Sequence, residues 1–341
     1  MILLAKNLHY NSILQIVLNF SFSNIYSIIF NGLVTVFSQV SYSYIFHIIF
    51  DCLLICLYSF FSILLIGDNL YKTVDVFILT FNQEISEEYD SELYKPLVCG
   101  RGKTDNKPRY FFDDEGDNIS NLNKYYSELT GEYWAWKNTN QDIIGFCHYR
   151  RWFVRSLRWD NLTKSDIIND LNEYDIILPK PMKFIKPLYD FHKSLNVERP
   201  DYDVLFEDYV LVEDILKRFF PKYAKFYNEV MNDSYLWLNN MFICNRELAN
   251  DYFDWLFKVF DKISEEIDFD KYQSRDTRIF GFMAERLLTT YVIANDLKVK
   301  EYNVFLNMRK FPIVHVLICK YPILNKFEKY LEGLIKKLPF H

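Results

Sequence analysis

The sequence predicts an α/β fold, in which a mixed central sheet is flanked by helices. Short apolar runs at residues 74–80, 142–147 and 174–179 alternate with longer stretches in which apolar residues recur at helical spacing. The second run is followed at once by His-Tyr-Arg-Arg, residues 148–151. Open α/β sheets bind their ligands at the carboxyl ends of strands, so this polar cluster indicates a ligand site at that edge.

Composition limits the classes of function. The 341 residues can bury a large core in one or two domains. The net charge of −6 gives no basic footprint of the kind that binds nucleic acid, so no nucleic-acid partner is expected. The six cysteines show no metal-like pairing, and we expect buried thiols of a protein in a reducing compartment.

Residues 1–70 are predicted to be a hydrophobic, helical N-terminal segment. The run at 42–66 is long enough to cross a bilayer, and the run at 12–36, diluted by Ser and Asn, is a second candidate. Two interpretations stay open. Either the segment forms one or two transmembrane helices, or the true start lies near Tyr71 and the preceding residues are translated from upstream DNA.

Residues 71–305 are predicted to form one α/β domain and residues 306–341 a basic amphipathic tail. The tail could lie on an anionic membrane surface, or it could pack on the domain as a terminal helix. Residues 84–112 are expected as loops because Pro and Gly recur there. Further strands are expected at residues 237–244 and 298–305, and helices at 166–172, 203–220, 223–231, 246–266 and 275–295, with a short one within 184–203.

An acidic glycine turn at residues 113–118 precedes a helix rich in aromatic residues. Gly116 tolerates a positive φ angle, and either Ser120 or Asn121 can cap the helix, which is expected to end near Asn138. Residues 113–153 therefore combine an acidic turn, an aromatic helix, a short strand and the cluster at 148–151 in one stretch of the sequence.

Asp117 and Asn118 of this turn are candidates for contacts with sugar or ribose hydroxyls, and Asp117 also for catalysis or for holding a metal. The alternative is a solvated turn that caps the helix. Trp134 and Trp136 lie two residues apart and cannot share a helix face. One of them is expected in the core, and Trp136 is our candidate for stacking on a sugar or base.

Five sequence blocks occur in the order typical of one family, and together they span roughly residues 72–305. This part of the chain resembles the bacterial capsular and exopolysaccharide synthesis family catalogued as domain of unknown function 4422, which looks like glycosyltransferase family 111. The blocks are GDNIS at 116–120, ELTGEYWAWKN at 128–138, IGFCHYRRWF at 144–153, NNMFI at 239–243 and RIFGFMAERLL at 278–288.

The resemblance implies a GT-A-like, nucleotide-sugar-binding fold and a hexosyltransferase that uses a UDP-sugar in surface-polysaccharide assembly. Members of the family include galactofuranosyltransferases that use UDP-galactofuranose. We therefore expect transfer of a sugar to a polyprenyl-linked oligosaccharide at the cytoplasmic face of the bacterial inner membrane. Two alternatives stay open: a non-catalytic membrane scaffold of a polysaccharide assembly complex, and a sugar-phosphate transferase to a lipid carrier.

Such a reaction needs the charge that develops on the donor diphosphate to be neutralised. Many GT-A enzymes use an Asp-x-Asp pair with Mn²⁺ or Mg²⁺, whereas here the strand leads into His148, Tyr149, Arg150 and Arg151. Because the guanidinium fork suits phosphate oxygens, we expect the arginines, with His148, to replace a metal at least in part. The alternative is a structural ion pair between one arginine and Asp117. No cofactor is certain, and a divalent metal stays open.

The reaction also needs a base for the acceptor hydroxyl. Glu285 is the first candidate, because it follows Gly281 early in a predicted helix, where inverting GT-A enzymes often present an acidic residue. Asp276 is a second candidate, and a structural ion pair of Glu285 with Arg286 is the alternative. Asn239 and Asn240 are expected to face the donor sugar or the acceptor, and the alternative is a turn whose side-chain amides bond within the protein. His192 could reach the site, but a lone histidine is more often packed or exposed.

Overall fold

The computed structural model describes residues 72–81, 92–100, 110–155, 160–198, 204–272 and 277–306. The chain divides into two units, Met1–Tyr71 and Lys72–His341, and all described residues belong to the second. The predicted membrane segment, the predicted tail beyond residue 306 and Asp276 lie outside the described residues.

An eight-stranded mixed sheet forms the centre of the described unit, in the order β3-β2-β1-β4-β5-β10-β6-β9, with a further pairing of β4 with β9. Strands β1 to β4 run parallel, β9 is antiparallel to β4 and β6, and β10 is parallel to β6 and antiparallel to β5. The strands are β1 Val74–Thr80, β2 Tyr94–Val98, β3 Phe111–Phe112, β4 Ile143–His148, β5 Arg151–Val154, β6 Ile176–Pro179, β9 Phe242–Asn245 and β10 Val299–Leu306, and a separate pair consists of β7 Met182–Lys183 and β8 Tyr235–Leu236.

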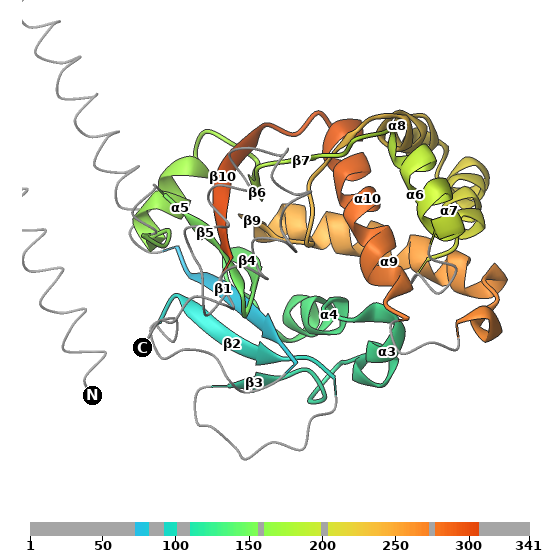
Figure 1. Ribbon diagram of the computed structural model, residues 1–341. Helices are drawn as coiled ribbons and strands as arrows, with labels where there is room; N and C mark the ends of the chain where they lie inside the picture. Colours follow the sequence, from blue (N-terminus) through green and yellow to red (C-terminus); the bar gives the residue numbers. More distant parts are fainter. Residues whose placement is uncertain are drawn as a thin grey trace, which may run out of the picture. The chain divides into compact units, whose positions relative to one another are not determined.

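Helices cover both faces of the sheet (Figure 1). Side chains on β1 alternate between two cores: Phe77 and Leu79 pack with the larger helical group, and Val76 and Ile78 pack with α5. Because both faces are covered, all seven residues of β1 are buried. The helices are α3 Asn123–Tyr126, α4 Leu129–Asn138, α5 Lys164–Asp170, α6 Leu188–Glu198, α7 Phe206–Phe219, α8 Pro221–Asn232, α9 Arg246–Glu266 and α10 Ile279–Ala294, with short 3₁₀ turns at Ser120–Leu122 and Phe269–Lys271.

Three expectations are wrong in detail. The region 84–112, expected as loops, contains β2 and β3, whose patterns are hidden because β2 includes Pro96 and β3 has only two residues. The strand expected at 237–244 is confined to β9, because Asn239 and Asn240 both have positive φ angles and turn the chain. The single helix expected after Ser120 is split into three pieces.

Ser127 causes the main break in that helix. Its φ angle of 54° places it outside helical geometry, between α3 and α4. Ser120, expected as a cap, instead donates its hydroxyl to Asp113 Oδ1 at 2.6 Å. Asp113 is buried and also accepts from the backbone of Gly100 and from Thr130. The break gives α4 an N-terminus of its own, and Glu128 stands directly before it.

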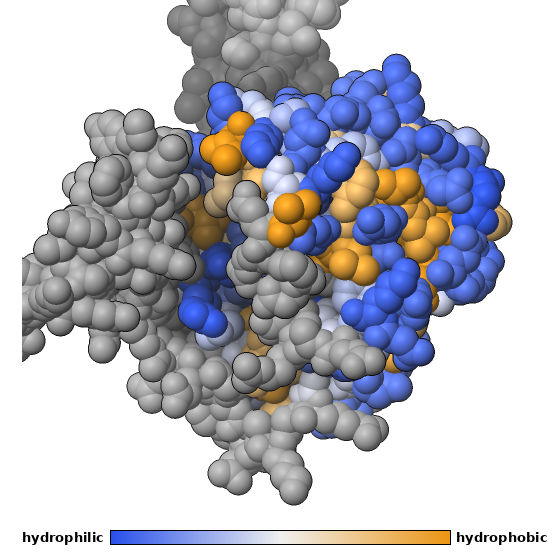
Figure 2. Space-filling view, turned by 45° about the vertical axis from the view of Figure 1, so that its right-hand side comes forward, coloured by the Kyte–Doolittle hydropathy of each residue, from blue (hydrophilic) through white to orange (hydrophobic). Residues whose placement is uncertain are grey.

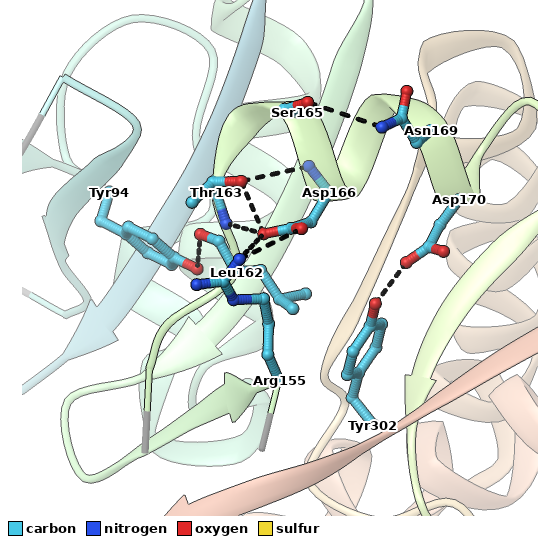
Figure 3. A network of polar contacts seen from close by, with 9 residues as sticks. All are labelled: Tyr94, Arg155, Leu162, Thr163, Ser165, Asp166, Asn169, Asp170 and Tyr302. Atoms are coloured by element: carbon cyan, nitrogen blue, oxygen red, sulfur yellow. Dashed lines mark hydrogen bonds and ion pairs between the residues drawn. The ribbon is translucent and has the colours of Figure 1, made fainter. Parts of the chain in front are cut away.

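A polar network connects α5 to the sheet, and Figure 3 shows it at close range. Thr163 and Asp166 form a capping box at the start of α5, in which the Thr163 backbone N–H donates to Asp166 Oδ2 at 2.8 Å. Arg155 adds an ion pair to Asp166 at 3.4 Å, and the Tyr302 hydroxyl donates to Asp170 at 2.5 Å. These contacts fasten α5 to β5 and β10.

Most of the coloured surface in Figure 2 is hydrophilic, and a patch of apolar residues lies on the side that is turned forward. Exposed apolar side chains on or beside α6 and α7 include Ile185, Val197 and Val210. Among the helices that the structure describes between residues 72 and 306, none has both the length and the apolar character of a membrane span.

Candidate functional site

The His-Tyr-Arg-Arg cluster forms a tight hairpin between β4 and β5. His148 pairs with Arg151 across the hairpin, so Tyr149 and Arg150 form its two-residue turn. The Tyr149 N–H donates to Leu79 O at 3.0 Å, which ties the turn to the end of β1. The guanidinium of Arg150 lies 4.5 Å from the centre of the Tyr149 ring, on the exposed side of the hairpin.

Arg151 is partly buried and lies among charged groups. Burial, and then the charge of Arg150, lower the pKa of Arg151, while the carboxylates of Glu285 and Glu128 oppose that shift. The end of β4 therefore brings two arginines together with two carboxylates from distant parts of the chain. The Arg151 guanidinium remains cationic at any ordinary pH.

His148 holds the neighbouring turn and is buried. Its Nε2–H donates to the backbone carbonyl of Asn239 at 2.6 Å. Burial lowers the pKa of His148, and the nearby arginines add to this, whereas Glu128 opposes it. The ring is therefore neutral near pH 7. The structure therefore shows that His148 holds the Asn239 turn, and its expected contact with a diphosphate stays a prediction.

Asn239 and Asn240 form a turn that has consecutive positive φ angles of 74° and 49°. The left-handed region costs a non-glycine residue roughly 1–2 kcal/mol, least for Asn, so the surrounding contacts must hold the turn. The Asn239 N–H donates to Glu285 Oε1 at 2.7 Å. Asn240 Nδ2 donates to Glu128 Oε1 at 2.8 Å and to Gly281 O at 2.9 Å.

Glu128 is the site residue that sequence reasoning missed. It precedes α4 and is partly exposed, and it commits Oε1 to Asn240. A Cβ atom on Gly281 would lie 3.6 Å from the same oxygen, so the start of α10 passes close to Glu128. The available signal was the position of a carboxylate at the start of an aromatic helix, where the helix dipole favours negative charge.

The Glu285 side chain is 12% exposed, and both of its oxygens are engaged. Oε1 accepts from Asn239, and Oε2 accepts from Arg286 Nη1 at 2.6 Å. Burial raises the pKa of Glu285, and Arg286 is the strongest influence in the opposite direction. The structural ion pair with Arg286, which was the alternative interpretation, is present. Glu285 also lies at the site, beside Arg151 and the Asn239 turn.

Asp117 and Asn118 are not brought to this cluster. Both polar groups of Asp117 bond to α4 instead. The Asp117 N–H donates to Asn138 Oδ1 at 3.0 Å, and the Asp117 carboxylate accepts from the Tyr133 hydroxyl. Asn138 ends α4 whereas Glu128 precedes it, so the Asp117 backbone is held at the far end of a ten-residue helix that is about 15 Å long. Asn118 bonds within its own turn, to the carbonyl of Gly116.

Trp136 is also placed elsewhere. Its indole N–H donates to Asn250 Oδ1 at 3.1 Å, and its ring stacks on Phe257 at 5.8 Å between α4 and α9. Lys137 Nζ lies 3.4 Å from the centre of the ring. Trp134 is buried, as expected for one of the two tryptophans. The sugar-stacking role predicted for Trp136 is therefore not supported by its position.

The polar groups at the site do not match a metal centre built from protein ligands. Within the described ranges, no three side chains of His, Cys, Asp or Glu are placed to share an ion. The end of β4 carries arginines, which cannot be ligands because they have no free lone pair. A divalent metal that is held by the donor diphosphate stays a prediction to be tested.

A comparison with known protein families gives a match over most of the described unit. Residues 77–296 match the family described as Domain of unknown function (DUF4422). The chain belongs to this family. The matched residues include the β4–β5 hairpin, the Asn239 turn, Glu128 and Glu285. The resemblance drawn from the five sequence blocks is thereby confirmed, and no curated protein sequence matches the chain.

Two solved structures are similar. One is the apo structure of the bifunctional glycosyltransferase WbbM, with 27% identity and a TM-score of 0.59 over 68% of this chain. The chain spans only 45% of that structure's length. The other is glucosyl-3-phosphoglycerate synthase from Mycobacterium tuberculosis with Mn²⁺, UDP and glucosyl-3-phosphoglycerate, with 11% identity and a TM-score of 0.29 over 65% of this chain and 82% of that one. The likeness to WbbM shows that the described unit has a mixed α/β, glycosyltransferase-like fold, as the sequence predicted.

Proposed function

We propose that this protein is a glycosyltransferase that uses a nucleotide-sugar donor. One observation carries the proposal: in a glycosyltransferase-like fold, β4 leads into Arg150 and Arg151, and the carboxylates of Glu128 and Glu285 act electrostatically on Arg151. Transfer of a sugar from a diphosphate donor requires both kinds of group. The cations neutralise the diphosphate leaving group, and a partly exposed carboxylate receives the proton of the acceptor hydroxyl.

The two arginines are the proposed diphosphate-binding groups. Arg150 is exposed on the hairpin turn and Arg151 is partly buried beside it, so both can approach a ligand at the end of β4. As the bond between the anomeric carbon and the diphosphate oxygen breaks, negative charge grows on that oxygen, and the guanidinium groups stabilise it. Tyr149 positions Arg150 by contact with its guanidinium.

Glu128 is the proposed base, which changes the assignment made from the sequence. It is partly exposed and commits one oxygen to Asn240, whereas Glu285, with a side chain only 12% exposed, commits both of its oxygens. Glu128 would take the proton of the acceptor hydroxyl while that oxygen forms the new bond to the anomeric carbon, with inversion. Glu285 would hold the Asn239 turn, and that turn would face the sugar.

The finer assignments follow from the family resemblance. We propose UDP-galactofuranose as the donor and a polyprenyl-linked oligosaccharide as the acceptor, in the synthesis of capsule, exopolysaccharide or O-antigen. We place the reaction at the cytoplasmic face of the bacterial inner membrane. Support for this comes from the apolar run at 42–66 and the lysine-rich tail, both of which would hold the enzyme near a polyprenyl anchor.

The test is a nucleotide-release assay on the full-length chain with a lipid-linked acceptor mixture and UDP-galactofuranose, UDP-galactose or UDP-glucose. We expect UDP release from one donor, and loss of that release in the Arg150→Ala and Arg151→Ala variants but not in Arg155→Ala. Arg155 is a matched control because it is an arginine on the opposite face, paired with Asp166. UDP release that persists in EDTA would indicate that the arginines, and not a divalent metal, neutralise the charge of the diphosphate.

Three results would overturn the proposal or part of it. Release of UMP would indicate a sugar-phosphate transferase. Folded protein that neither binds UDP nor turns over any donor would indicate a scaffold. Full activity in both arginine variants would remove the diphosphate-binding role.

A further inference from the structure

A buried chain of polar contacts leads away from the site through α10 to α6. Glu285 Oε2 accepts from Arg286 Nη1, which also donates to Phe282 O at 2.8 Å. The other terminal nitrogen, Arg286 Nη2, lies 3.0 Å from His192 Nε2. His192 and Arg286 are only 1% and 3% exposed, so this contact takes place in the protein interior.

The chemistry of the two groups fixes the direction of that hydrogen bond. A guanidinium has only donors, so His192 Nε2 must accept, and the hydrogen of the neutral imidazole must sit on Nδ1. Burial, with help from the Arg286 charge, lowers the pKa of His192 to about 2, which keeps the acceptor free of a proton. Among the described residues His192 Nδ1 has no hydrogen-bond partner, so the imidazole gains its polar contact through Nε2.

Packing against α7 restrains both side chains. The His192 ring stacks on Tyr209 with 4.2 Å between ring centres, and the Arg286 guanidinium lies 5.4 Å from the centre of the same ring. Figure 1 shows α6, α7 and α10 side by side at this end of the molecule. An arginine that is held on three sides cannot turn away from Glu285.

We propose that His192 is a positioning residue for sugar transfer, which acts through Arg286 and Glu285 to hold the Asn239–Asn240 turn in its left-handed conformation. The inference rests on the proposed function for its kinetic consequence. Glu285 anchors the turn from one side through the Asn239 N–H, and His148 anchors it from the other through the Asn239 carbonyl. Without the acceptor on His192, Arg286 loses one of its fixed partners and Glu285 loses its orientation.

Two substitutions separate this role from simple packing. His192→Phe keeps a ring against Tyr209 but has no acceptor, whereas His192→Gln can present its amide oxygen near the position of Nε2. A hydrogen bond to a charged group is worth a factor of about ten or more, so we expect His192→Phe to lower kcat about tenfold or more with the donor KM nearly unchanged. His192→Gln should retain most of the wild-type kcat.

Amide hydrogen exchange provides a readout that does not depend on activity. In His192→Phe the Asn239 N–H should exchange about tenfold faster or more, because its acceptor on Glu285 is no longer fixed, and His192→Gln should keep it protected. The Tyr149 N–H, bonded to Leu79 O in the adjacent hairpin, is the internal control and should not change. If His192→Phe does not fold, Arg286→Lys, which lacks the fork that bridges Glu285 and His192, should release Asn239 in the same way.

Unchanged protection of Asn239 in folded His192→Phe would overturn the proposal, and so would equal impairment in the Phe and Gln variants. If the wild-type protein transfers no sugar, the proposed function fails while the exchange result still decides whether His192 positions the turn.

Discussion

Two sets of polar contacts lie at opposite faces of the same sheet, and they differ in reach and burial. The capping box and the ion pair at the start of α5 join residues close in sequence, Thr163 and Arg155 with Asp166, where the helix start is partly exposed. The site network joins Glu128 to Asn240 across 112 positions, and its ion pair of Glu285 with Arg286 is buried. The local contacts define a helix end. The long-range buried contacts hold the Asn239–Asn240 turn in the left-handed conformation, which the backbone disfavours.

The largest expected effect tests the chemical role of the site network. Glu128→Gln keeps an oxygen that can accept from Asn240 but removes the proton acceptor, so we expect kcat to fall by about 10²–10⁴-fold with the fold intact. Steady-state kinetics with UDP binding measured in parallel would check this. A Gln variant with wild-type kcat would return the base role to Glu285.

The next effect compares the two ion pairs. Arg286→Met leaves the Glu285 carboxyl buried without its cation, and breaking such a pair costs about 3–5 kcal/mol of unfolding free energy. Arg155→Met breaks a pair whose arginine side chain is 43% exposed, for which about 0–1 kcal/mol is expected. Urea unfolding of both variants measures the difference. Equal losses would show that burial does not distinguish the networks.

The same contrast explains what the sequence could predict. Strands β1, β4 and β6 and helices α9 and α10 were predicted near their observed residues, because their apolar periodicity is a local property. The capping pair Thr163 and Asp166 is similarly local. The position of the His-Tyr-Arg-Arg cluster at the carboxyl end of β4 was also predicted, because the cluster follows a short apolar strand directly in the sequence, whereas its hairpin with β5 was not.

The rest of the site depended on contacts between distant segments. Glu128 belongs to the site because it accepts a hydrogen bond from Asn240. The helix break that positions Glu128 occurs at Ser127, where no glycine or proline marks it in the sequence. Asp117 was a reasonable candidate by spacing, but its distance from the cluster is set by the length of α4. His192 became informative only when α6 brought it against Arg286.

Two aspartates should respond to pH in opposite directions. Burial raises the pKa of Asp208, whose carboxylate accepts from Tyr272, to about 6, with Lys271 opposing the shift. For Asp166, burial acts upward, but the hydrogen bonds from Thr163 and the charge of Arg155 outweigh it and lower the pKa. An unfolded aspartate has a pKa of about 3.9, so the two differ in the sign of their shift.

The consequence for stability follows from proton linkage. The contribution of Asp208 is full below pH of about 4 and is lost as pH rises through about 6, whereas that of Asp166 is full above about 4 and is lost as pH falls through its lowered value. The Tm difference between wild type and Asp208→Asn should therefore shrink from pH 4 to 7, and that for Asp166→Asn should shrink from pH 5 to 3. Parallel pH profiles in the two variants would contradict the assignment.

The smallest effect concerns the capping box. Thr163→Ala removes the side chain that accepts from the Asp166 N–H, and loss of such a cap costs about 0.5–2 kcal/mol. Because α5 covers the face of the sheet opposite α4 and α10, the Asn239 turn and the arginine hairpin should be undisturbed (Figure 1). We therefore expect a lower midpoint of urea unfolding together with unchanged sugar transfer. A loss of transfer that exceeds the loss of folded protein would mean that the two faces are coupled through β5, whose first residue, Arg151, belongs to the site and whose last, Val154, lies next to Arg155.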